Sequence, residues 1–145
     1  MSVASEASQV NLDFLINELG LQQVSNTSVF RKGNIFVISP SAHNKSNTFE
    51  LGESLMQKFN PETDDGYLLI RLKEKFLMCK LHPFQRKMMT SDTEKSTKSK
   101  PSFWKFHVIE SIIPRIENSG DRELTFKIQA PTNKQLISFF NKESL

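Results

Sequence analysis

Apolar side chains recur every three to four residues in three segments, which is the spacing of an amphipathic helix. These segments are 11–20, 47–59 and 134–141. In the first, Asn11 can serve as N-cap and Gly20 as the residue that follows the last turn. The second opens on Asn47-Thr-Phe-Glu50, which has the form of a capping box, and Pro61 ends it. Thr132 caps the third.

Apolar and polar residues alternate in other segments, which predicts strands. The predicted strands are 29–30, 34–39, 67–72, 76–81, 103–109 and 123–129. The first four form two pairs across short turns, as in β-hairpins. In the fifth, the alternation places Trp104, Phe106 and Val108 on the inward face and Lys105 and His107 on the outward face.

The order of these elements indicates an α+β fold with one mainly antiparallel sheet of about six strands and two or three packed helices. Segment 84–89 is expected to be a further short turn or helix. Segment 90–102 holds no apolar side chain except the Pro101 ring, so we expect a long, mobile, basic loop. Residues 1–9 are expected to be a flexible terminus, and residues 10–145 one compact domain.

Composition supports a packed domain. The chain has 145 residues, of which 37% are hydrophobic and twelve are Phe. This is enough for a core without disulfides, and the single Cys79 excludes an internal one. No apolar run approaches the roughly 18–20 residues that span a bilayer, and residues 1–9 do not resemble a secretory signal. We therefore expect a soluble intracellular protein, cytoplasmic or nuclear, with no membrane partner.

Charge is unevenly distributed although the net charge is only +3. Residues 1–70 hold four basic and eight acidic side chains, whereas residues 71–115 hold eleven basic and four acidic ones. Residues 116–145 hold four of each. A basic segment within an otherwise ordinary surface is typical of a protein that binds a polyanion.

The basic segment predicts nucleic-acid binding, because flexible lysines can reach phosphates and neighbouring hydroxyls can hydrogen-bond them. Duplex DNA is favoured over single strands, since Trp104 and Phe106 are expected to face inward. By analogy, such a module suits the specificity domain of a restriction or mobile-element system. The predicted binding residues are Arg31, Lys32, Lys45, Arg86, Lys87, Lys95, Lys98, Lys100, Lys105 and His107.

Two other functions stay open. In one, the basic face docks an acidic protein chain, as in an interaction or inhibitor domain. In the other, the chain is a phosphodiesterase-like enzyme. His43-Asn44-Lys45 followed by Glu50 resembles the H-x-K-x4-D core of the phospholipase D superfamily, in which His is the nucleophile and Lys holds the phosphate. The chain departs from that pattern because Glu50 replaces Asp and the Gly-Ser-x-Asn element is absent.

Signatures of other chemistry are weak. Cys79 and His82 form only an isolated C-x-x-H pair, whereas a structural zinc site needs four ligands. The strand that follows Asp64-Asp65 lacks the D/E-x-K triplet of a metal-dependent nuclease. The five glycines form no phosphate-binding loop. The sequence therefore favours a non-catalytic domain with no cofactor or metal.

Overall fold

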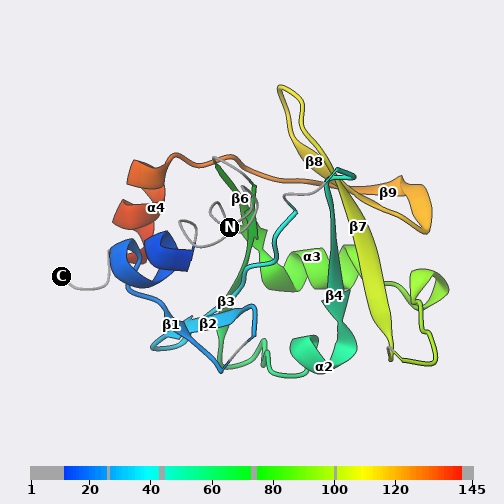
Figure 1. Ribbon diagram of the computed structural model, residues 1–145, viewed down its shortest axis with the longest axis horizontal. Helices are drawn as coiled ribbons and strands as arrows, with labels where there is room; N and C mark the ends of the chain where they lie inside the picture. The colour runs from blue at the N-terminus through cyan, green and yellow to red at the C-terminus, as the bar shows by residue number, and fades with distance from the viewer. Residues whose placement is uncertain (1–11, 26, 43–44, 73–74, 100, 142–145) are drawn as a thin grey trace.

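The computed structural model describes residues 12–25, 27–42, 45–72, 75–99 and 101–141 (Figure 1). Within these ranges the chain has mixed helical and strand content with mainly antiparallel sheets, which confirms the α+β class. The strands divide between two sheets, of five and four strands, where the sequence predicted one sheet of about six.

The first sheet contains both predicted hairpins. Its strands are β1 (Gln22–Gln23), β2 (Val29–Lys32), β3 (Ile35–Ile38), β5 (Asp65–Arg71) and β6 (Phe76–Lys80), in the order β1-β2-β3-β5-β6. All neighbours are antiparallel except β3 and β5, which are parallel. The β2–β3 turn is Gly33-Asn34, where Gly33 adopts a φ of +61° that favours glycine.

The second sheet is antiparallel throughout. Its strands are β4 (Thr48–Gly52), β7 (Phe103–Ile109), β8 (Arg115–Asn118) and β9 (Asp121–Lys127), in the order β4-β7-β8-β9. The helical elements are η1 (Phe14–Glu18), α2 (Glu53–Met56), α3 (Leu81–Met88), η2 (Ser91–Thr93) and α4 (Asn133–Phe140).

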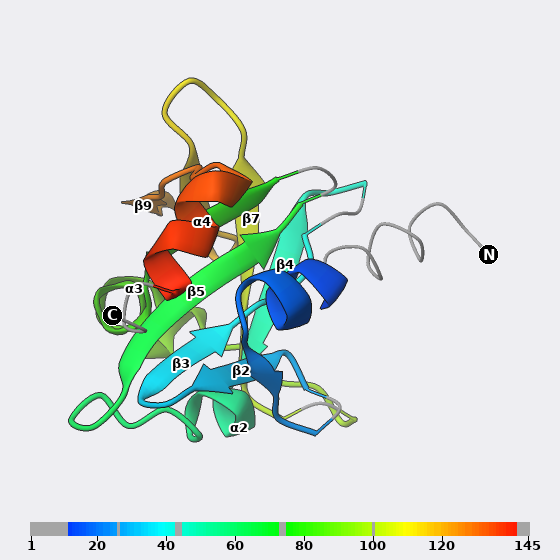
Figure 2. The ribbon, with the colours of Figure 1, turned by 90° about the vertical axis from the view of Figure 1, so that its left-hand side faces the viewer.

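Two apolar clusters lie on opposite faces of the first sheet, and all four residues of β3 are buried. On one face pack η1 and α4, through residues such as Leu15 and Phe140. Figure 2 shows these two helices in front of the sheet. On the other face pack α3 and the inner face of the second sheet, through residues such as Phe84 and Phe106. The outer face of the second sheet carries the polar side chains of its strands.

Helix α4 confirms the sequence prediction at its start. The Thr132 hydroxyl accepts a hydrogen bond from the Gln135 backbone N–H at 3.1 Å, and the Gln135 side chain accepts one from the Thr132 N–H at 2.9 Å. This is a complete capping box. Gly20 follows η1 with a φ of +70°, as expected for the residue after a helix. Asn11, the predicted cap of η1, lies outside the described residues, as do residues 1–9.

The predicted helix 47–59 is wrong. Residues 48–52 form β4, and only Glu53–Met56 are helical. Phe49 and Leu51 are buried against β7, while Glu50 faces outward. Asn47 adopts a φ of +52°, whereas an N-cap residue has extended backbone, so Asn47 and Glu50 form no capping box.

The described residues of segment 90–102 include a short helical turn and a bridge to β7. Thr90 precedes the η2 turn, in which Thr93 is only 9% exposed. Lys95 and Phe103 then exchange backbone hydrogen bonds of 2.8 and 2.9 Å. The sequence also missed β1 and β8. Strand β8 follows Pro114 and has a single fully buried apolar residue, Ile116, so its alternation is faint.

Candidate nucleic-acid interface

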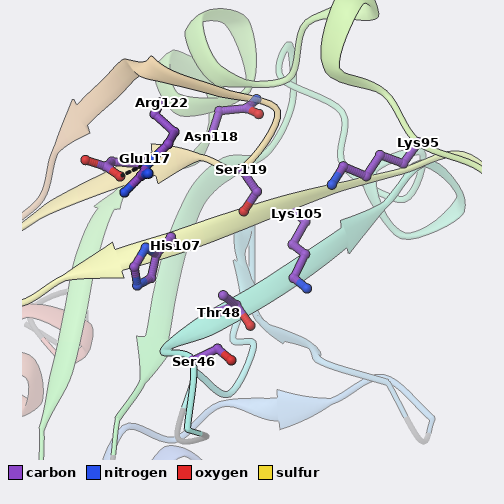
Figure 3. A pocket seen from close by; sticks show the side chains of 9 residues that line it. All are labelled: Ser46, Thr48, Lys95, Lys105, His107, Glu117, Asn118, Ser119 and Arg122. Carbon is purple, nitrogen blue, oxygen red and sulfur yellow. Dashed lines mark ion pairs between the residues drawn. The ribbon is translucent and has the colours of Figure 1, made fainter.

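A cleft of about 320 Å³ opens on the outer face of the second sheet (Figure 3). Its walls come from β4 and the segment before it, from β7 and β8, from β9 and the turn that leads into it, and from the segment after η2. We call it the cationic cleft, and its lining residues are Ser46, Thr48, Lys95, Lys105, His107, Glu117, Asn118, Ser119 and Arg122.

The pleat of β7 explains why this face is basic. Successive side chains of a strand point to opposite faces, so buried Trp104, Phe106 and Val108 require Lys105 and His107 to point outward. His107 is paired across the sheet with Thr48 on β4 and with Glu117 on β8. Three strands thus contribute one row of polar side chains to the cationic cleft.

Lys95 reaches the cleft because its segment is folded back on β7. The indole Nε1 of Trp104 donates to the Thr90 carbonyl at 2.8 Å. The Asn118 amide donates to the Thr93 hydroxyl at 2.9 Å. With the paired hydrogen bonds between Lys95 and Phe103, these contacts place Lys95 in the same cleft as Lys105. These contacts therefore hold the segment that precedes β7 against the second sheet.

Cationic side chains outnumber the acidic one in the lining. Lys95, Lys105 and Arg122 line the cleft with His107, and Glu117 is the one carboxylate among the described lining residues. Glu117 lies 3.6 Å from Arg115 and 3.9 Å from Arg122, between guanidinium and carboxylate atoms. Lys95, Lys105 and His107 take part in no ion pair with the residues that the structure describes.

An excess of positive charge next to hydroxyl groups suits an anion with several oxygens. Ser46, Thr48 and Ser119 supply the hydroxyls, and the Ser119 backbone N–H donates to the Lys105 carbonyl at 2.9 Å, which fixes the β8–β9 turn against β7. Glu50 is the strand partner of Lys105 but does not line the cleft. Phosphate oxygens could pair with the ammonium groups and accept the hydroxyl protons.

Arg31 and Lys32 lie elsewhere, on β2 of the first sheet, and both make contacts within the fold. Arg31 donates to both carboxylate oxygens of Asp64 at 3.1 and 3.2 Å and lies 4.9 Å from the Phe36 ring centroid. The hydrogen bond from Arg31 lowers the pKa of Asp64. Lys32 donates to the Phe140 carbonyl at 2.7 Å, and so holds the end of α4.

The other predicted residues are dispersed. Arg86 and Lys87 occupy the last turn of α3, beside a separate shallow hollow that His82 and Pro83 also line. Lys45 and Lys98 are exposed. Lys100 and the proposed nucleophile His43 lie outside the described residues. The structure therefore brings Lys95, Lys105 and His107 together among the ten predicted residues.

Sequence reasoning missed Glu117, Ser119 and Arg122, because β8 was not predicted. Asn118-Ser-Gly-Asp121 has turn composition, but nothing local in the sequence shows that the flanks of this turn pair beside β7. The available signal was the short alternation of outward Arg115 and Glu117 around inward Ile116.

The remaining chemistry of the described residues is sparse. Across the described ranges, no group of three or more His, Cys, Asp or Glu side chains is placed to hold a metal ion. Burial raises the pKa of the Cys79 thiol to about 12, which disfavours a reactive thiolate.

No helix in the described part of the chain is long and apolar enough to cross a membrane. No family model, curated protein or solved structure matches the chain.

Proposed function

We propose that the chain is a nucleic-acid-binding domain that contacts the phosphate backbone of duplex DNA with the outer face of its second sheet. The observation that carries this proposal is the convergence of Lys95, Lys105 and His107 from two chain segments in the cationic cleft. Such contacts release counterions from the DNA, and hydroxyl groups beside the lysines add hydrogen bonds to phosphate oxygens.

Duplex DNA is favoured over single-stranded nucleic acid. Proteins that bind single strands without sequence preference stack the bases on exposed aromatic rings. Among the described residues that line the cationic cleft, the His107 imidazole is the only aromatic ring. Trp104 and Phe106, on the same strand, are 9% and 0% exposed and pack inward. A sheet face of cations and hydroxyls instead suits a regular array of phosphates.

The role of the domain is then recognition without catalysis. The size and layout of the chain suit a specificity module of a restriction or mobile-element system, an inference by analogy. Positioning by phosphate contacts comes first in such modules, and base contacts add selectivity. Lys105 and His107 point outward from β7 and could reach base edges from a strand that lies in the major groove.

The deciding experiment is fluorescence anisotropy with a random duplex at two salt concentrations. The test variant is K95A/K105A, and the matched control is K58A/K134A, which removes the same charge from exposed lysines outside the cleft. We expect the test variant to lose at least about tenfold in affinity and to reduce the salt slope by about two. The control should retain most of the binding.

Three outcomes would contradict the proposal. They are no duplex binding at low salt, an equal loss in the control variant, and binding of single-stranded DNA more tightly than duplex. A further arm uses polyglutamate as competitor. If polyglutamate displaces the duplex at equal charge concentration, the face recognises acidic polymers in general, as a domain that docks an acidic protein would.

A further inference from the structure

The loop between β7 and β8 projects from the body of the molecule in both views (Figures 1 and 2). We call residues 110–114 the hairpin tip. Its two central side chains are apolar and exposed: Ile112 is 102% exposed and Ile113 is 62% exposed. The Ser111 hydroxyl donates to the Ile113 carbonyl at 2.6 Å, which holds the turn in shape.

Packing within the fold does not account for these isoleucines. Among the described residues, the other exposed large apolar side chains are Ile16 and Phe139, at 40% and 38%. Each of those side chains has more than half of its surface covered, and each lies in a helix that packs on the first sheet, Ile16 in η1 and Phe139 in α4. Two neighbouring branched side chains at the extreme of a hairpin, by contrast, contribute nothing to the core, so their apolar surface is available to a ligand.

The surroundings of the hairpin tip indicate what that ligand is. Arg115 and Lys127 are strand partners at the end of β8 and β9 nearest the tip. Lys75 is ion-paired with Glu110 at 3.1 Å, at the other flank. Because Lys75 and Arg115 are ion-paired with Glu110 and Glu117, these side chains together leave one net positive charge, that of Lys127, at the base of the tip, whereas the core of a protein–protein interface is depleted of charge. A polyanion with an apolar interior fits both features.

The hairpin tip is also continuous with the cationic cleft. Both belong to β7 and β8, and the cleft side chains Lys105 and His107 lie on the strand that leads to the tip. Four residues separate His107 from Ile112, and this length of chain spans at most about 18 Å even when fully extended. That upper limit is well below the helical repeat of 34–36 Å, so one duplex could contact both.

We infer that Ile112 and Ile113 insert between base pairs of the bound duplex as an apolar wedge, from the minor groove, and kink the DNA. The inference rests on the proposed function, because the cleft supplies the phosphate contacts that hold the duplex. Aliphatic side chains and Pro are the residues that wedge base steps apart in DNA-bending proteins, and Pro114 follows directly. Pyrimidine–purine steps unstack most easily and should be preferred.

The test uses the full chain and a duplex of about 30 base pairs with a donor and an acceptor dye at its ends. A central TA step carries 2-aminopurine in place of the adenine. Binding is followed by anisotropy, bending by energy transfer and unstacking by 2-aminopurine fluorescence. The test variant is I112S/I113S, whose changes lie on exposed side chains, and thermal unfolding checks that its fold is kept. The conservative control is I112L/I113L.

We expect the wild type and I112L/I113L to raise both energy transfer and 2-aminopurine fluorescence on binding. I112S/I113S should still bind, with an affinity at most about tenfold lower than that of the wild type. It should lose most of the increase in both energy transfer and 2-aminopurine fluorescence. Binding of the wild type without either signal would overturn the wedge and leave the proposed function standing. Absence of any duplex binding would overturn both.

A parallel arm sediments the protein with vesicles of phosphatidylserine and phosphatidylcholine. Sedimentation that depends on the two isoleucines would identify the tip as a membrane-binding element instead and overturn the wedge.

Discussion

The side-chain amide of Asn118 donates a hydrogen bond of 2.9 Å to the hydroxyl of Thr93 and so joins β8 to the segment that precedes β7. The same amide nitrogen donates to the Met88 carbonyl at 2.9 Å, and the amide oxygen accepts from the Gly120 N–H at 2.7 Å. Asn118 is 1% exposed. Each of its polar atoms has a partner, as a buried amide requires, and the result is a fixed position for Lys95.

Replacement of Asn118 by alanine should therefore destabilise the fold and weaken DNA binding together. The change leaves the buried Met88 carbonyl without this partner and removes the acceptor of the Gly120 N–H, and the loss of the buried bond costs about 1–3 kcal/mol. We expect that loss in the free energy of unfolding from urea titration. Anisotropy under conditions where the variant is folded should show weaker duplex binding, because the segment that carries Lys95 is released.

A double-mutant cycle isolates the bond between the two side chains. T93V removes the hydroxyl while keeping the shape of the side chain. If the Asn118–Thr93 hydrogen bond is the coupling, the N118A/T93V variant should lose less stability than the sum of the single changes, by about 0.5 kcal/mol or more. Strict additivity would show that Asn118 acts through Met88 and Gly120 alone.

What the sequence could predict was local. The β2–β3 hairpin and α4 were found because a Gly-Asn turn and the Thr132 cap act over a few residues. Strand β4 was mistaken for a helix because the spacing of its apolar residues is compatible with both a helix and a strand. Pairing with β7 makes this segment a strand. In that register Phe49 lies opposite Phe106 and Leu51 opposite Trp104. Tertiary contacts of this kind override local propensity.

The candidate site shows the same division. Lys105 and His107 were assigned to the outer face from the alternation of β7 alone, and the structure agrees. Arg122 could not be found, because it reaches the cleft through the pairing of β9 with β8 and of β8 with β7. Arg31 is a basic residue in a predicted turn, and nothing nearby in sequence showed that Asp64, thirty-three residues away, is its partner.

The Arg31–Asp64 pair predicts how stability depends on acid. The hydrogen bond from Arg31 holds the pKa of Asp64 below its ordinary value of 3.8 in the folded protein. Asp64 thus binds protons more weakly when the chain is folded. Its contribution to stability is fully present above about pH 4–5 and is lost as pH falls below 3.8 through the lower folded pKa.

We expect the D64N variant to lose that part of the acid response. Urea titrations at pH 6, 4 and 3 should show a smaller decrease in the free energy of unfolding for D64N than for the wild type. The control is E62Q, which changes an exposed carboxylate two residues away. Equal acid sensitivity of D64N and the wild type would mean that the ion pair contributes nothing in solution.

The last prediction concerns Glu117, the one carboxylate among the described residues that line the cationic cleft. Its Oε1 is buried without a hydrogen-bond partner and lies 3.9 Å from the Arg122 Nε. It therefore reduces the positive potential of the cleft while making only a weak contact.

E117Q should raise duplex affinity about 2–5-fold at low salt, because removal of one partly exposed charge changes the binding free energy by about 1 kcal/mol or less. The increase should be smaller at high salt, where charges are screened. E62Q, which removes the same charge from another surface, should leave anisotropy binding curves nearly unchanged. Weaker binding by E117Q would show instead that Glu117 orients Arg115 and Arg122 for the ligand, and that this positioning outweighs its charge.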